Sequence, residues 1–145
     1  KKDLIITAGG KNVAPQPIEN ILKAIPYIGN VVVIGDRQRF ISALIVPNFE
    51  KLEEYAKFKN IPYGDRRDLV KNEQILDFLM AEIERATPGL ASYEKIRKIA
   101  LLDREFEIER GEITPTLKVR RKIVEQKYED LIAALYRENA VEGKL

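Results

Sequence analysis

A lysine that precedes a basic, helix-patterned segment is the feature of this sequence best suited to chemistry. The segment reads Gly111-Glu-Ile-Thr-Pro-Thr-Leu-Lys-Val-Arg-Arg-Lys122. The threonines and proline at 114–116 favour a constrained loop, and the apolar spacing at 124, 128, 131 and 135 predicts a helix. A cation held at such a junction can be directed at an anion. Lys118 is therefore the candidate catalytic residue, and the alternative is a solvated basic face, which clusters of Lys and Arg on small domains usually form.

A second patterned stretch opens the chain and reads Lys1-Lys-Asp-Leu-Ile-Ile-Thr-Ala-Gly-Gly-Lys-Asn-Val-Ala-Pro-Gln-Pro-Ile-Glu19. Residues 4–7 predict a short strand that ends at Gly9 and Gly10. Glycines permit backbone angles and close approaches that side chains would block, so another molecule could pack against this loop. The alternative is an ordinary turn at the end of a strand.

Together the two stretches resemble the last two core motifs of the adenylate-forming superfamily, which includes AMP-forming acyl- and aryl-CoA synthetases, luciferases and peptide-synthetase adenylation domains. In that family the first motif runs roughly Gly-Arg-x-[Asp/Lys]-Asp-x-Ile-x-x-x-Gly, and the second ends in a lysine followed by a hydrophobic and two basic residues. This sequence follows both motifs in order, but without the leading Gly-Arg. The resemblance extends to about Tyr136 and is to the small C-terminal domain only. It implies that residues 1–145 form one mobile lid domain that begins at an inter-domain hinge, with the large N-terminal domain absent from this chain.

Details within the two motifs resemble the long-chain fatty acyl-CoA synthetases in particular. These details are the sequence Gly-Gly-Lys-Asn-Val-Ala-Pro at 9–15, Ala-Leu-Ile-Val-Pro at 43–47, and Leu117 where most relatives have glycine before the lysine. The long helical segment between the apolar runs at 41–46 and 96–102 also resembles that branch. The resemblance therefore implies a long-chain fatty acid-CoA ligase.

The chemistry that the resemblance implies has two half-reactions, which use ATP, a fatty acid and CoA. The resemblance places Lys118 between the fatty acid carboxylate and the α-phosphate of ATP, and Gly9 and Gly10 along the tunnel for the pantetheine arm of CoA. It places the hinge at Lys2 and Asp3, and it assigns Mg²⁺, adenine and the acyl chain to the large N-terminal domain. The isolated chain should therefore be inactive, with no metal site of its own. Lys11 matches a basic position that contacts nucleotide phosphate or the facing domain in some relatives. Arg120 and Arg121 could reach the CoA phosphates, although a basic helix surface is the favoured interpretation of these two residues.

Composition restricts the possible functions independently of any family. The chain has 145 residues, of which 45% are hydrophobic, which suits one core and one domain. Its 25 basic and 23 acidic residues give a net charge of +2, so the whole-domain field does not call for a nucleic acid or a membrane as partner. The absence of cysteine and histidine excludes disulfides, thiolate metal ligands and histidine-based catalysis. The apolar runs are far shorter than the roughly 20 residues that span a bilayer. With no signal peptide at its start, the domain is expected to be soluble and cytoplasmic, with at most peripheral membrane association of the full-length enzyme.

The helices and strands expected around the candidate site residues indicate an α+β fold, in which helices flank a small mixed sheet. Pro17 suits a first helical turn and Pro26 should end that short helix. Two β-branched runs around Gly35 predict a buried hairpin. The expected elements are strands at 30–36, 40–47 and 96–102, a pair of half-exposed strands within 105–113, helices at 48–59, 68–86 and 118–136, and a frayed end at 138–145.

Two alternatives to a long-chain ligase remain open from the sequence. The first is an aryl or other acid as substrate within the same superfamily. The second is a non-catalytic interaction module or RNA-binding module that uses the basic face at 118–127, which would show phosphate affinity with a steep salt dependence. The near-zero net charge and the lack of an aromatic platform argue against the second alternative.

Overall fold

The structure is a computed structural model that describes residues 3–142, with side chains described up to residue 137. Contacts divide the chain into two compact units, the first ending at Asp103 and the second beginning at Arg104. The expectation of one core is therefore incomplete, because the C-terminal residues form a compact unit of their own. Each unit is described by itself below.

The first unit begins with a two-stranded hairpin and a short helix. Strands β1 (Ile5–Ile6) and β2 (Asn12–Val13) pair antiparallel, and helix α1 (Pro15–Lys23) follows at once. Pro15 occupies the first helical position, where no backbone donor is needed, and the helix ends before Pro26 as predicted. The buried carboxylate of Glu19 accepts a hydrogen bond from the backbone N–H of Val33 at 2.8 Å, which ties α1 to the sheet.

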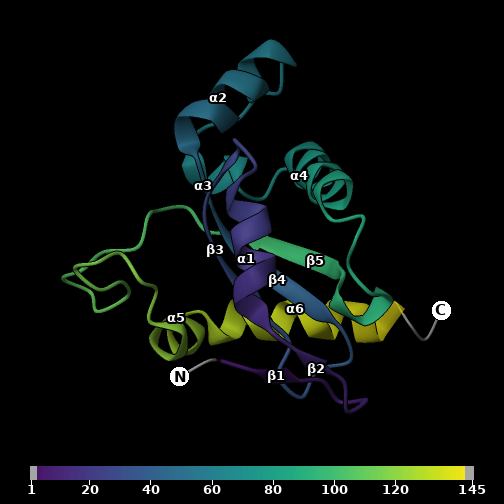
Figure 1. Ribbon diagram of the computed structural model, residues 1–145. Helices are drawn as coiled ribbons and strands as arrows, with labels where there is room; N and C mark the ends of the chain where they lie inside the picture. Colours follow the sequence, from purple (N-terminus) through teal and green to yellow (C-terminus); the bar gives the residue numbers. More distant parts are fainter. Residues whose placement is uncertain (1–2, 143–145) are drawn as a thin grey trace. The chain divides into compact units, whose positions relative to one another are not determined.

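A three-stranded mixed sheet forms the centre of the first unit (Figure 1). Strand β3 (Ile28–Ile34) pairs antiparallel with β4 (Ile41–Pro47), and β5 (Ile96–Leu101) pairs parallel with β4, giving the order β3-β4-β5. Helix α1 packs against β3, and helix α4 (Glu73–Ala86) packs against β5. The hairpin and the mixed sheet predicted from the sequence are confirmed, and so is the α+β fold.

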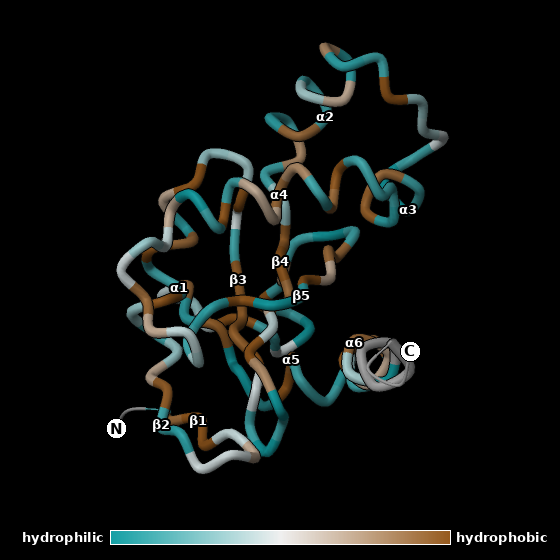
Figure 2. Tube along the Cα trace, turned by 90° about the vertical axis from the view of Figure 1, so that its right-hand side faces the viewer, coloured by the Kyte–Doolittle hydropathy of each residue, from teal (hydrophilic) through white to brown (hydrophobic). Residues whose placement is uncertain are grey.

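The central strand explains why this sheet is the core. Every residue of β4 is buried, so both of its faces are covered, and the brown trace of β3 and β4 in Figure 2 reflects their β-branched and aliphatic residues. Burying such side chains contributes roughly 1.5–3 kcal/mol each. Gly35 directly follows β3, and a Cβ added there would displace the end of the Ile41 side chain.

The prediction of one helix over 68–86 is wrong, because capping side chains divide the segment. Helix α2 (Phe49–Phe58) matches its prediction, but α3 (Arg66–Leu69) ends before α4 begins at Glu73. The side chain of Asn72 accepts from the backbone N–H of Ile75 at 3.1 Å and so starts a new helix. The side chain of Asp65 caps α3 in the same way. A short 3₁₀ turn, η1 (Ser92–Glu94), precedes β5.

The second unit differs more from its prediction. Residues 105–113 form no strand pair, but a turn that ends at Gly111 with φ of +74°, and only Ile113 makes a bridge, to Val119. The expected helix over 118–136 is two helices, α5 (Arg121–Lys127) and α6 (Glu129–Glu142). Helix α5 begins later than the predicted start at Lys118, because Lys118 is held in the hairpin loop. Helix α6 continues through Glu142, where a frayed end was predicted. The turn and the break after Lys127 are not visible in the apolar spacing that suggested a strand pair and a single helix.

Candidate functional site

Lys118 closes a tight hairpin loop that begins at Thr114. The backbone N–H of Leu117 donates to the carbonyl of Thr114 at 2.7 Å, which makes a turn with Pro115 at its second position. The backbone N–H of Thr114 donates to the carbonyl of Lys118 at 2.8 Å, and the N–H of Lys118 donates back to the Thr114 hydroxyl at 3.0 Å. The main chain of Lys118 is therefore fixed on both sides. Its side chain is exposed and, within residues 3–142, its ammonium makes no hydrogen bond or ion pair.

Leu117 adopts a left-handed backbone conformation, with φ of +66°. Such a conformation costs a non-glycine residue roughly 1–2 kcal/mol. A glycine at this position would avoid the steric cost. The Leu117 side chain is also 70% exposed, so burial does not offset the cost within this chain.

The glycine loop near the start of the chain has the same construction. The backbone N–H of Gly10 donates to the carbonyl of Thr7 at 2.9 Å, and Gly10 has φ of +85°. The N–H of Thr7 donates to the carbonyl of Lys11 at 3.0 Å, and the N–H of Lys11 donates to the Thr7 hydroxyl at 3.1 Å. Nothing lies within 4 Å of a Cβ placed on Gly9 or Gly10, so these glycines keep one side of the loop open.

The two candidate motifs thus share one frame: a threonine, two loop residues, a residue with positive φ, and a lysine. Thr7 and Thr114 have equivalent roles, as do Lys11 and Lys118. The lysines differ in their surroundings, because the Lys11 ammonium lies 5.3 Å from the ring centroid of Tyr93, a cation–π distance. Lys11 is therefore oriented by its own unit.

A buried ion cluster stands beside the Lys118 loop, and it was not predicted from the sequence. The fully buried carboxylate of Glu112 accepts hydrogen bonds from Nη1 and Nη2 of Arg104, at 2.9 and 2.6 Å, and from the ammonium of Lys127 at 3.3 Å. It also accepts from the backbone N–H of Glu107 at 2.9 Å. The Arg104 hydrogen bonds hold the pKa of the Glu112 carboxyl at about 2, and Glu112 in turn raises the pKa of Arg104. The sequence signal for this cluster is a glutamate inside the motif, three residues before the loop proline Pro115.

The predicted site residues fall into two groups, one in each unit. Asp3, Gly9, Gly10 and Lys11 belong to the first unit, and Asp3 is exposed. Lys118, Arg120 and Arg121 belong to the second unit, where Arg120 caps α5 without a side-chain hydrogen bond to the helix and Arg121 begins it. The predicted hinge residue Lys2 lies outside the described residues. Each group is compact by itself.

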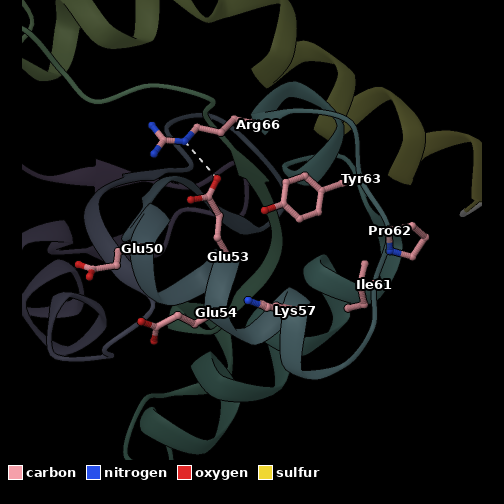
Figure 3. Close-up of a pocket in the computed structure, with 8 residues that line it drawn as sticks. All are labelled: Glu50, Glu53, Glu54, Lys57, Ile61, Pro62, Tyr63 and Arg66. Carbon is pink, nitrogen blue, oxygen red and sulfur yellow. Dashed lines mark hydrogen bonds and ion pairs between the residues drawn. The ribbon is translucent and has the colours of Figure 1, made fainter.

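An open cleft of about 610 Å³ on α2 and the connection to α3 contains none of these residues (Figure 3). Glu53 in this cleft is paired with Arg66 at 3.4 Å. Three carboxylates on its wall make it a poor host for nucleotide phosphates. Its lining residues are Glu50, Glu53, Glu54, Lys57, Ile61, Pro62, Tyr63 and Arg66.

Neither metal-binding clusters nor membrane-spanning helices are found in the described part of the chain. Among residues 3–142, no group of three or more acidic side chains is placed to hold a metal ion. None of the helices described here is both long enough and apolar enough to cross a bilayer.

The fold is that of the C-terminal subdomain of adenylate-forming enzymes. The adenylation part of a carboxylic acid reductase from Segniliparus rugosus, solved with its carrier domain and AMP, superimposes with a TM-score of 0.72 at 26% identity. That match covers 96% of this chain and 18% of the reductase chain.

Sequence relatives agree. The chain is 39% identical over 137 residues to the long-chain-fatty-acid-CoA ligase FadD15 of Mycobacterium tuberculosis, covering 94% of this chain and 23% of the ligase. It is 35% identical over 155 residues to the human long-chain-fatty-acid-CoA ligase ACSBG1, covering 94% of this chain and 21% of that protein. The chain therefore spans less than a quarter of the length of these relatives. The sequence profile described as AMP-binding enzyme C-terminal domain matches residues 2–140, and the chain belongs to that family.

Proposed function

We propose that this chain is the C-terminal domain of an AMP-forming long-chain fatty acid-CoA ligase. The observation that carries the proposal is the exposed ammonium of Lys118, which has no ion pair within residues 3–142, on a hairpin held by hydrogen bonds, in a chain similar to ligases of that name. The rest of the active site, including the groups that bind adenine, the acyl chain and Mg²⁺, belongs in this proposal to a larger N-terminal domain. The full enzyme is proposed to be cytoplasmic or peripheral at a membrane.

In the first half-reaction, a fatty acid carboxylate oxygen attacks the α-phosphate of ATP, and the bond to pyrophosphate breaks to leave an acyl-adenylate. The Lys118 ammonium would lie between the carboxylate and an α-phosphate oxygen, which repel each other without it. At an effective dielectric near 20, such a charge pair about 4 Å apart is worth roughly 4 kcal/mol. A lysine fits this role because its charge is compact and its stem is long.

In the second half-reaction, the CoA sulfur attacks the acyl carbon, and AMP leaves. The loop at Gly9 and Gly10 would face the pantetheine arm, since both positions leave open space where a side chain would stand. Lys11, Arg120 and Arg121 are proposed to face phosphates of the nucleotide or of CoA. Rotation about a hinge at Lys2 and Asp3 would exchange the two loops between half-reactions.

The test joins this chain to its N-terminal domain and follows the conversion of ATP, palmitate and CoA to AMP, pyrophosphate and palmitoyl-CoA. Turnover by the joined enzyme, with none from this chain alone, is the expected result. Activity with an aryl or short acid but not with palmitate would retain the family and overturn the long-chain assignment. Adenylation of no acid at all would overturn the ligase proposal and favour a binding module.

A further inference from the structure

Glu112 is a buried charge whose partners come from both ends of the segment that carries Lys118. Its side chain is fully buried, whereas those of Arg104 and Lys127 are 29% and 38% exposed. The two guanidinium contacts are bidentate, the strongest and most directional form of such a pair. A buried carboxylate with this set of donors is fixed in one place, because any displacement would leave a charge unpaired in the interior.

The ammonium of Lys127 closes this segment on itself. Lys127 lies in the last turn of α5 and reaches back to Glu112 at 3.3 Å and to the carbonyl of Arg110 at 3.0 Å. Residues 112–127, with Lys118 among them, thus form a loop whose ends are joined by an ion pair. Fixing both ends reduces the conformations open to the hairpin between them.

The main chain of Glu112 carries this constraint to the lysine. The carbonyl of Glu112 accepts from the backbone N–H of Arg120 at 2.8 Å. The next pair along the hairpin is the bridge between Ile113 and Val119, and the pair after that is Thr114 with Lys118. Glu112, whose carboxylate is held by the ion cluster, therefore also forms the base of the hairpin. Lys118 lies near its tip.

We propose, on the basis of the ligase function above, that Glu112 is a positioning residue for Lys118. Its carboxylate, held by Arg104 and Lys127, fixes the base of the hairpin so that the Lys118 ammonium reaches the reacting oxygens at the correct place. It touches no substrate. Displacing a catalytic group by about 1 Å can slow a reaction by about 10²-fold, so a loosened base should be visible in the rate.

The experiment uses the full-length enzyme and measures the two half-reactions separately. Adenylation is followed by pyrophosphate release, and thioester formation by the reaction of preformed palmitoyl-adenylate with CoA. Glu112→Gln keeps the shape of the side chain and removes its charge, and it should slow adenylation by about 10-fold or more while leaving thioester formation unchanged. In a Lys118→Ala background the same substitution should cause no further loss. The matched control is Arg110→Gln, which removes an exposed pair with Glu107 but no side-chain contact of Glu112, and it should leave both rates unchanged.

Several results would overturn the inference. Equal losses in both half-reactions would show that Glu112 only supports folding. An unchanged adenylation rate in Glu112→Gln would show that Glu112 does not act through Lys118. A further loss in the Lys118→Ala background would show the same. If Glu112→Gln does not fold, Lys127→Met keeps the Arg104 pair and should give a smaller loss with the same selectivity for adenylation; equal losses there would also refute the inference. If Lys118→Ala itself adenylates normally, the role proposed for Lys118 fails instead, and with it the rate test of Glu112. Hydrogen exchange at the Lys118 amide then still tests the structural step, since Glu112→Gln should speed it and Arg110→Gln should not.

Discussion

The hydroxyl and the backbone N–H of Thr114 hold both main-chain groups of Lys118, at 3.0 and 2.8 Å. A lysine side chain is long and flexible, so its ammonium can be aimed only if its main chain is fixed. Thr114 provides this fixation without touching the ammonium. The same arrangement joins Thr7 to Lys11 in the glycine loop, which makes the two threonines natural subjects for paired experiments.

Thr114→Val should loosen Lys118, because valine has nearly the shape of threonine but cannot accept the Lys118 N–H. Loss of one such hydrogen bond costs about 1 kcal/mol. We expect adenylation to fall several-fold, and Thr114→Ser, which keeps the hydroxyl, to restore it. Thr7→Val is the matched variant and should slow thioester formation instead. Stopped-flow measurement of each half-reaction checks this, and a loss confined to the same half-reaction in both variants would contradict it.

Lys118→Ala should slow adenylation by about 10²-fold or more, because it removes a cation from the transition state. Thioester formation from preformed acyl-adenylate should be unaffected. Lys71→Ala is the control, since Lys71 is an exposed lysine in the turn between α3 and α4. Pyrophosphate release measures the effect, and a wild-type rate in the Lys118 variant would remove that residue from the proposed mechanism.

Leu117→Gly should stabilise the protein by roughly 0.5–1 kcal/mol, because glycine adopts positive φ without steric cost but loses more freedom on folding. Gly10→Leu is the reverse change in the equivalent position and, by the same balance, should destabilise by roughly 0.5–1 kcal/mol. That cost comes from the backbone alone, since a Cβ at Gly10 meets nothing within 4 Å. Urea unfolding monitored by circular dichroism gives both values. Equal changes of the same sign would mean that the two positions are not equivalent.

Stability should fall as the pH is lowered through the range in which Glu112 becomes protonated. The pKa of Glu112 is lowered from 4.5 to about 2, chiefly by Arg104, so the folded state binds this proton less readily than the unfolded state. The stabilisation is therefore complete above about pH 5 and is lost as the pH approaches 2. Its size is roughly 3 kcal/mol. Glu112→Gln should be less stable at pH 7 and should lose this part of the pH dependence, which urea unfolding at pH 7, 5, 4 and 3 can measure.

The sequence predicted secondary structure correctly where a single residue type determines the element. The β-branched runs predicted β3 and β4, and Pro15 and Pro17 predicted the start of α1. The helices around Asn72 and Tyr128 were predicted as continuous because their apolar spacing continues across both breaks. Apolar periodicity reports which face is buried, whereas the break at Asn72 depends on a side chain turning back to cap the next helix.

The residues of the candidate site can be proposed from the sequence, but the contacts that hold their loops could not be predicted from it. Lys118 and the two glycines follow from motifs in the chain. The strand pair expected at 105–113 is instead a turn. The alternating pattern of polar and apolar residues did not indicate that Glu112 is buried against Arg104 and Lys127. The shared frame is readable afterwards in Thr-Ala-Gly-Gly-Lys and Thr-Pro-Thr-Leu-Lys, but Leu117 hides it, since leucine does not ordinarily signal positive φ.

The ion cluster at Glu112 has a consequence for protein engineering. Arg104 opens the second unit and Lys127 ends α5, and both bind the same carboxylate. The stretch 104–127 therefore contains all three residues of the ion cluster, together with Lys118. We expect this stretch to be exchangeable between related domains as a unit, provided that Arg104, Glu112 and Lys127 are transferred together.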